Sequence, residues 1–71
     1  MGVFLKYAKD IDRGDVIDLK GDPYIEEIGS EFYPTKPQTV VGVEPGAAIT
    51  TVHFQEVTVL FPSQHRVICT L

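Results

Sequence analysis

Residues 49–61 read ITTVHFQEVTVLF, and this stretch decides the fold class that the sequence predicts. Apolar and polar residues alternate along 49–54 and again along 57–61, with a two-residue link between the runs. Because alternate side chains of a β-strand point to opposite faces, each run can bury one face and expose the other. Two such runs joined by a tight link predict an antiparallel β-hairpin.

The rest of the chain repeats this pattern of short apolar runs separated by Gly, Pro, Asp and Ser. No helix-length segment places its apolar residues at a 3.6-residue spacing. Tight links favour antiparallel pairing, since a parallel crossover needs a dozen or more residues. We therefore expect one all-β domain over residues 1–71, a small barrel of five or six short antiparallel strands. Besides the hairpin, strands are predicted at residues 3–8, 15–19, 24–28, 39–44 and 66–71, with a long loop at 29–38.

The chain contains one cysteine, Cys69, so it cannot form an internal disulfide. An unpaired cysteine favours a reducing compartment. No apolar run reaches the length of a signal peptide or of a membrane span. We therefore expect a cytoplasmic protein that does not enter a membrane.

The net charge of −4 is unevenly distributed. Residues 1–35 hold eight acids and four bases, whereas residues 36–71 hold two of each. Proteins that bind nucleic acid neutralise phosphates with Lys and Arg, so an acidic chain with six bases is a poor candidate. The acidity is consistent either with simple solubility or with an acidic face for a basic partner.

Few side chains are suited to catalysis or metal binding. The soft ligands are His53, His65 and Cys69, which is one short of a four-ligand structural zinc site. A three-ligand site with water is the alternative, but we expect His53 to face solvent, His65 to lie in a turn and Cys69 to be a buried core residue. On the predicted strand, Glu26 and Glu27 would point to opposite faces. The sequence therefore predicts a protein that is not an enzyme and has no metal or other cofactor.

Residues 13–24 read RGDVIDLKGDPY, and they resemble the opening hairpin of many SH3-like barrels. One example is the N-terminal domain of the elongation factor P and initiation factor 5A family. The resemblance implies an SH3-like barrel fold. It does not extend to the ribosomal function, because Lys36 lies between Thr35 and Pro37 and not on the Gly-flanked loop of that family. The overall pattern is also similar to small proteins of actinobacterial phages, which implies a phage-encoded protein.

The loop at 29–38 is the predicted functional site. Phe32 and Tyr33 are adjacent aromatics in a polar, Pro-containing segment, and Lys36 adds a positive charge. Aromatic residues are enriched at interface hot spots, so we expect these three residues to contact a protein partner. The alternative is that both rings cap the open end of the barrel as extra core.

The predicted function is a small non-catalytic binding module that acts through protein–protein contacts, including self-association as a homo-oligomer. The first alternative is a nucleic-acid-binding barrel of the KOW or Tudor-like type. In that alternative, Phe32, Tyr33 and either Tyr7 or Tyr24 would stack on bases. The side chains near the nucleic-acid backbone would be Lys36, Arg66 and His65. A metal protein or an enzyme is the remote third class.

Overall fold

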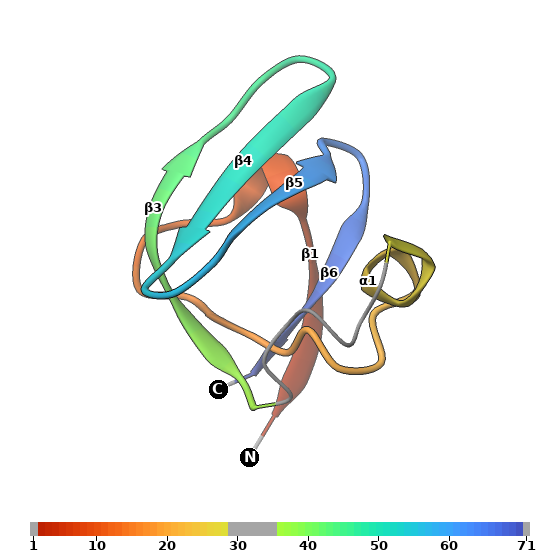
Figure 1. The fold of residues 1–71 in the computed structure, drawn as a ribbon, viewed down its shortest axis with the longest axis vertical. Helices are drawn as coiled ribbons and strands as arrows, with labels where there is room; N and C mark the ends of the chain where they lie inside the picture. The colour runs from red at the N-terminus through yellow and green to blue at the C-terminus, as the bar shows by residue number, and fades with distance from the viewer. Residues whose placement is uncertain (1, 29–35, 71) are drawn as a thin grey trace.

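Six antiparallel strands form one sheet in the order β1-β6-β2-β3-β4-β5 (Figure 1). The computed structural model describes residues 2–28 and 36–70. The strands are β1 (Val3–Tyr7), β2 (Val16–Ile17), β3 (Gln38–Glu44), β4 (Ile49–Phe54), β5 (Thr58–Pro62) and β6 (Arg66–Thr70). Two short helices interrupt them, the 3₁₀ helix η1 (Ala8–Asp10) and the α-helix α1 (Pro23–Ile28). Neither described helix has the length and apolar character needed to span a bilayer.

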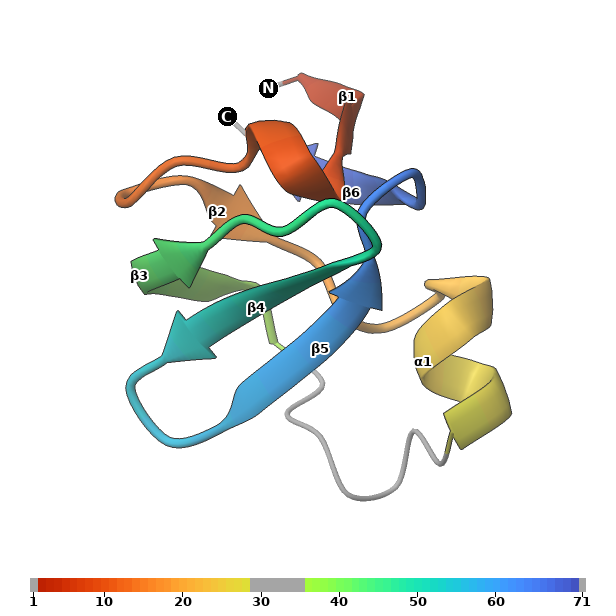
Figure 2. The ribbon, with the colours of Figure 1, turned by 90° about the horizontal axis from the view of Figure 1, so that it is seen from above.

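The sheet curls strongly at β3, the strand that joins its two halves. This strand pairs with β2 on one side and with β4 on the other (Figure 2). The register between β3 and β4 shifts between Val40 and Gly42, which leaves Val41 as the extra residue of a bulge. After β1, the backbone N–H of Ala8 donates to the carbonyl of His65 at 2.8 Å, so η1 lies against the turn between β5 and β6. The predicted all-β fold of short antiparallel strands is confirmed as a barrel-like sheet, whose ladder stays open at the edge strands β1 and β5.

The core lies inside this curled sheet and follows the alternation that the sequence shows. Val52 and Phe54 of β4 are buried, whereas His53 between them is partly exposed. The inward-facing residues of β5 and β6 are buried in the same way, including Cys69. Burial raises the pKa of the Cys69 thiol above its usual value. The predicted hairpin and the predicted burial of Cys69 are therefore confirmed.

The strand predicted at residues 24–28 is wrong, because Pro23–Ile28 is an α-helix. Asp22 caps this helix by accepting a hydrogen bond from the backbone N–H of Tyr24 at 2.9 Å, and Pro23 suits the first helical position. The spacing of Ile25 and Ile28, which fits a strand poorly, suits a helix, and Ile25 is buried in the core. As helical residues, Glu26 and Glu27 are both exposed. The predicted division of these two carboxylates between opposite sheet faces is therefore wrong.

Candidate functional site

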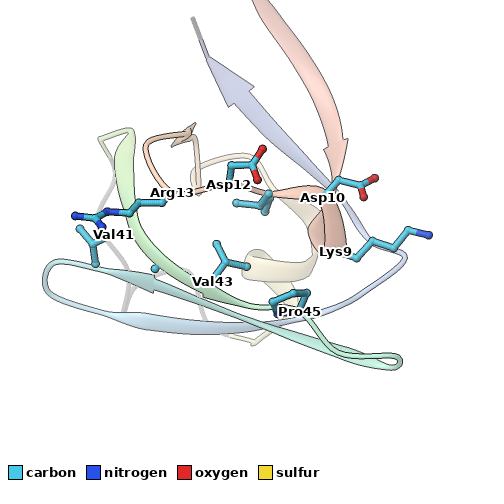
Figure 3. A pocket seen from close by; sticks show the side chains of 9 residues that line it. Lys9, Asp10, Asp12, Arg13, Val41, Val43 and Pro45 are labelled. Atoms are coloured by element: carbon cyan, nitrogen blue, oxygen red, sulfur yellow. The ribbon is translucent and has the colours of Figure 1, made fainter.

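An open groove of about 630 Å³ runs between the segment after β1 and the second half of β3 (Figure 3). One wall carries charged side chains and the other is apolar. Asp10 and Asp12 lie across the groove from Val43 and Pro45, while Arg13 lies beside Val41 at one end and Lys9 lies at the other. The lining residues are Lys9, Asp10, Ile11, Asp12, Arg13, Val41, Gly42, Val43 and Pro45.

The charged wall is held in place by the carboxylate of Asp15. Its Oδ2 accepts a hydrogen bond from the backbone N–H of Asp12 at 2.9 Å. The same oxygen forms an ion pair with the Lys6 ammonium at 2.7 Å. Burial alone would raise the pKa of Asp15, but these two donors outweigh it and the pKa is lowered. The hydrogen bond to Asp15 in turn raises the pKa of Lys6.

The turn of this wall is also tied directly to β3. The N–H of Gly14, which has a positive φ of 96°, donates to the carbonyl of Val40 at 2.9 Å. The N–H of Val40 donates back to the carbonyl of Asp15 at 2.8 Å. These two backbone hydrogen bonds therefore join the two walls of the groove directly.

The apolar wall is shaped by the bulge in β3 and by a buried hydroxyl pair. Val41 is 49% exposed next to the buried Val40, as alternation along a strand requires, and the bulge leaves Val41 without a direct partner on β4. Bulges often lie beside a functional site. Beyond Pro45, the Ser63 hydroxyl donates to the carbonyl of Gly46 at 2.6 Å and accepts from Thr50 Oγ1 at 2.8 Å. These bonds hold the turn after β3 against the β5–β6 turn.

A second exposed feature is the outer row of β1, which we define as Val3, Leu5 and Tyr7. These side chains are 70%, 56% and 38% exposed, respectively. The Tyr7 ring lies near two cations, with the Arg66 guanidinium 5.6 Å and the Lys9 ammonium 5.8 Å from its centroid. The outer row therefore combines an apolar strip with a basic end.

A third feature is a buried carboxylate at the start of α1 that is hydrogen-bonded to a histidine. The Asp22 carboxylate is fully buried, and its Oδ1 accepts a hydrogen bond from His65 Nε2 at 2.8 Å. The His65 ring stacks on Phe61 with centroids 5.7 Å apart, and it also contacts the Tyr24 ring. The second oxygen, Oδ2, is buried without a hydrogen-bond partner among the described residues. This pair joins α1 to the β5–β6 turn.

A hydroxyl, an imidazole and a carboxylate lie in a row on the outer face of the sheet. His53 Nε2 lies 2.6 Å from Glu44 Oε2, and its Nδ1 lies 3.1 Å from Thr58 Oγ1. This order matches that of a nucleophile, a base and an orienting carboxylate. The row lies on neighbouring strands outside the groove, and His53 and Thr58 are direct cross-strand partners. We therefore interpret these bonds as contacts that stabilise strand pairing.

The residues predicted as the site are not those that line the groove. Phe32 and Tyr33 lie outside the described residues, so their predicted role stays a prediction. Lys36 is exposed just before β3 and is not part of the groove lining. For residues 2–28 and 36–70, no cluster of three or more His, Cys, Asp or Glu is placed to hold a metal ion.

The sequence pattern predicts only a turn, at residues 10–14, between the strands at 3–8 and 15–19, and therefore does not reveal the groove. One signal was present, because Val40 and Val41 are adjacent apolar residues and a strand can bury only one of them. Comparisons with known protein families, with curated proteins and with solved structures found no match. The functional argument therefore depends on the geometry described above, and the resemblance to SH3-like barrels of translation factors stays a prediction.

Proposed function

We propose that the chain is a non-catalytic binding module whose groove takes an extended segment of a partner protein. The observation that carries this proposal is the pairing of an apolar wall, exposed at Val41 and Pro45 and half-buried at Val43, with a charged wall in one groove. Within the described part of the chain, Lys9, Asp10 and Arg13 form no salt bridge. Their charges are therefore available to a partner, and apolar contact with Val41 and Val43 would supply the burial.

The charge of the groove favours a partner segment that carries an apolar residue next to a lysine or arginine. Asp10 and Asp12 stand on the opposite wall, and in Figure 3 both carboxylates point away from Val43 and Pro45, so they would meet such a cation at the rim of the groove. The Asp12 side chain is 82% exposed, and its only ion pair among the described residues is a long contact to Lys6 at 3.4 Å. The net charge of −4 would also attract a basic partner during encounter.

The test is an affinity pull-down from the native cells, with mass spectrometry, using three forms of the chain. Val41→Lys alters the groove, whereas Leu60→Lys alters β5 at a site of similar exposure, 53% against 49%. The proposal predicts a partner that the wild-type and Leu60→Lys proteins retain and that Val41→Lys loses. Identical partner lists for all three proteins would contradict it. Adding Phe32→Ala and Tyr33→Ala to the set tests the contribution predicted for the 29–38 loop.

One observation favours the alternative, a barrel that binds single-stranded nucleic acid. Tyr7 is exposed beside Arg66 and Lys9, and an aromatic ring with adjacent cations can stack on a base and contact the backbone. Binding of this kind weakens steeply as salt rises. Titration with a labelled oligonucleotide at low and high salt checks this alternative, and no binding at low salt would eliminate it.

A further inference from the structure

We propose that β1 pairs edge to edge with β1 of a second copy of this chain, forming a twofold-symmetric homodimer through an antiparallel pairing centred on Leu5. This surface is separate from the apolar wall of the groove, so the inference goes beyond the binding function proposed above. In the described structure β1 has a strand neighbour, β6, on one side only (Figures 1 and 2). Its other edge therefore carries backbone groups that a second strand can pair with.

Among the described residues, the β1 edge lacks two of the features that usually protect an edge strand, a bulge and a proline. It pairs with β6 over five consecutive residues without a bulge, and it contains no proline. Its one charged residue, Lys6, lies opposite the buried Val67, on the inner side of the sheet. An inward-pointing lysine can itself oppose edge pairing, but here the ammonium is held by Asp15 at 2.7 Å, so its charge is already compensated within one copy. The opposite edge, β5, by contrast ends in Pro62.

The sequence of β1 is complementary to itself in this register. A twofold axis at Leu5 places Leu5 against Leu5 of the second copy and Val3 against Tyr7 of the second copy. Aromatic and β-branched residues form favourable cross-strand pairs, so the two outer rows merge into one apolar strip. On the inner side, Phe4, which is 40% exposed, would lie against the aliphatic stem of Lys6 of the second copy.

The charges near β1 permit this arrangement. Lys9 and Arg66 both lie at the Tyr7 end of the strand, as their contacts to the Tyr7 ring show. The twofold axis sends the equivalent cations of the second copy to the opposite end of the strip. Like charges therefore do not meet along the outer row, and on the inner side the two Lys6 ammonium groups, which are diagonal neighbours, are each paired with Asp15 of their own copy.

The small area of the β1 edge predicts a weak dimer. A stable standard interface covers about 800 Å² on each partner, and one strand edge of five residues offers less. We therefore expect a dissociation constant on the order of 10–100 μM, so that the dimer forms at high protein concentration.

Sedimentation velocity over about 10 μM to 1 mM protein tests the association. Leu5→Lys places a charge at the proposed axis, and Leu60→Lys is the matched control on the other edge strand, with exposures of 56% and 53%. The wild-type and Leu60→Lys proteins should approach twice the monomer mass, and Leu5→Lys should raise the dissociation constant at least tenfold. A wild-type protein that stays monomeric throughout, or a Leu5→Lys protein that dimerises like wild type, would overturn the proposal. Circular dichroism confirms that each variant is folded.

Cysteine cross-linking tests the register. Residues directly opposite in an antiparallel pair are close enough for a disulfide, so Leu5→Cys should cross-link to itself on mild oxidation. Val3→Cys alone should not, because the two copies of residue 3 would lie about 14 Å apart. A mixture of Val3→Cys and Tyr7→Cys proteins should form a mixed dimer, and the buried Cys69 of the wild type should form none. Efficient self-cross-linking of Val3→Cys would refute the antiparallel register.

Discussion

Replacing Asp22 by alanine tests whether its buried hydrogen bond with His65 attaches α1 to the rest of the sheet. Asp22 is fully buried and accepts two hydrogen bonds on one oxygen, from the N–H of Tyr24 at 2.9 Å and from His65 Nε2 at 2.8 Å. Because a carboxylate only accepts hydrogen bonds, the His65 Nε2 carries a proton in this contact. The substitution removes the helix cap and the contact to His65 together.

The expected effects have opposite signs. Loss of an N-cap costs about 1 kcal/mol, and loss of a hydrogen bond to a charged group costs about 1.5–3 kcal/mol. Removing the carboxylate also removes Oδ2, which is buried without a partner among the described residues and opposes folding by about 1–3 kcal/mol. We therefore expect a net loss of about 1 kcal/mol for Asp22→Ala, out of the roughly 4–11 kcal/mol expected for a domain of this size.

A double-mutant cycle separates the free energy of the Asp22–His65 hydrogen bond from the contributions of the helix cap and of the buried Oδ2. The cap and the buried Oδ2 contribute equally with and without His65, so they cancel in the cycle. Comparing wild type, Asp22→Ala, His65→Ala and the double variant by urea unfolding should give a coupling free energy of about 1.5–3 kcal/mol. A coupling below about 0.5 kcal/mol, the usual limit of additivity, would refute the assignment of this contact as a stabilising pair.

Three further predictions follow from single sites. The lowered pKa of Asp15 means that its contribution to stability is present above the ordinary value of 3.8 and is lost as pH falls through the folded pKa. Acid titration followed by circular dichroism should therefore show a smaller loss of stability for Asp15→Asn than for wild type. Gly14→Ala should cost about 1–2 kcal/mol in urea unfolding because of its φ of 96°, although its Cβ would meet no neighbour. Gly42→Ala should cost less, because Gly42 has no positive φ and a Cβ there would lie at an ordinary contact distance, 3.7 Å, from the His53 side chain. Equal losses of stability for the two variants would contradict this reasoning. Phe61→Ala should cost about 3–5 kcal/mol because the ring is fully buried, whereas Leu60→Ala should change stability by less than about 0.5 kcal/mol; equal thermal midpoints would show that the core lies elsewhere.

The sequence pattern was most informative where alternation is strict. Residues 49–54 were predicted as a strand and form β4 with the same bounds, Ile49–Phe54. The strand predicted at 15–19 shortens to Val16–Ile17, because the Asp15 and Asp18 side chains accept backbone N–H groups in the flanking turns. Local polar contacts of this kind compete with strand pairing, and alternation does not reveal them.

The helix at Pro23–Ile28 shows why a short segment can be misassigned. Its start carries local signals, an aspartate followed by a proline, that are typical of a helix N-terminus. Six residues are too few for an isolated helix to be stable, so its formation depends on tertiary contacts. Those contacts are the burial of Ile25 and the hydrogen bond that Asp22 accepts from His65, which lies 43 residues further along the chain.

By itself, the amino-acid order determined that this protein is built from short antiparallel strands and which residues of β4, β5 and β6 are buried, because a period of two is a local property of the chain. It did not determine the buried face of β1, whose alternating Val3, Leu5 and Tyr7 are exposed. The tertiary structure alone decided which exposed residues lie together. The groove joins residues 9–13 to residues 41–45, and the open edge of β1 exists only because the curled sheet does not pair β1 with β5. Such surfaces arise from contacts between distant segments, and no local periodicity records them.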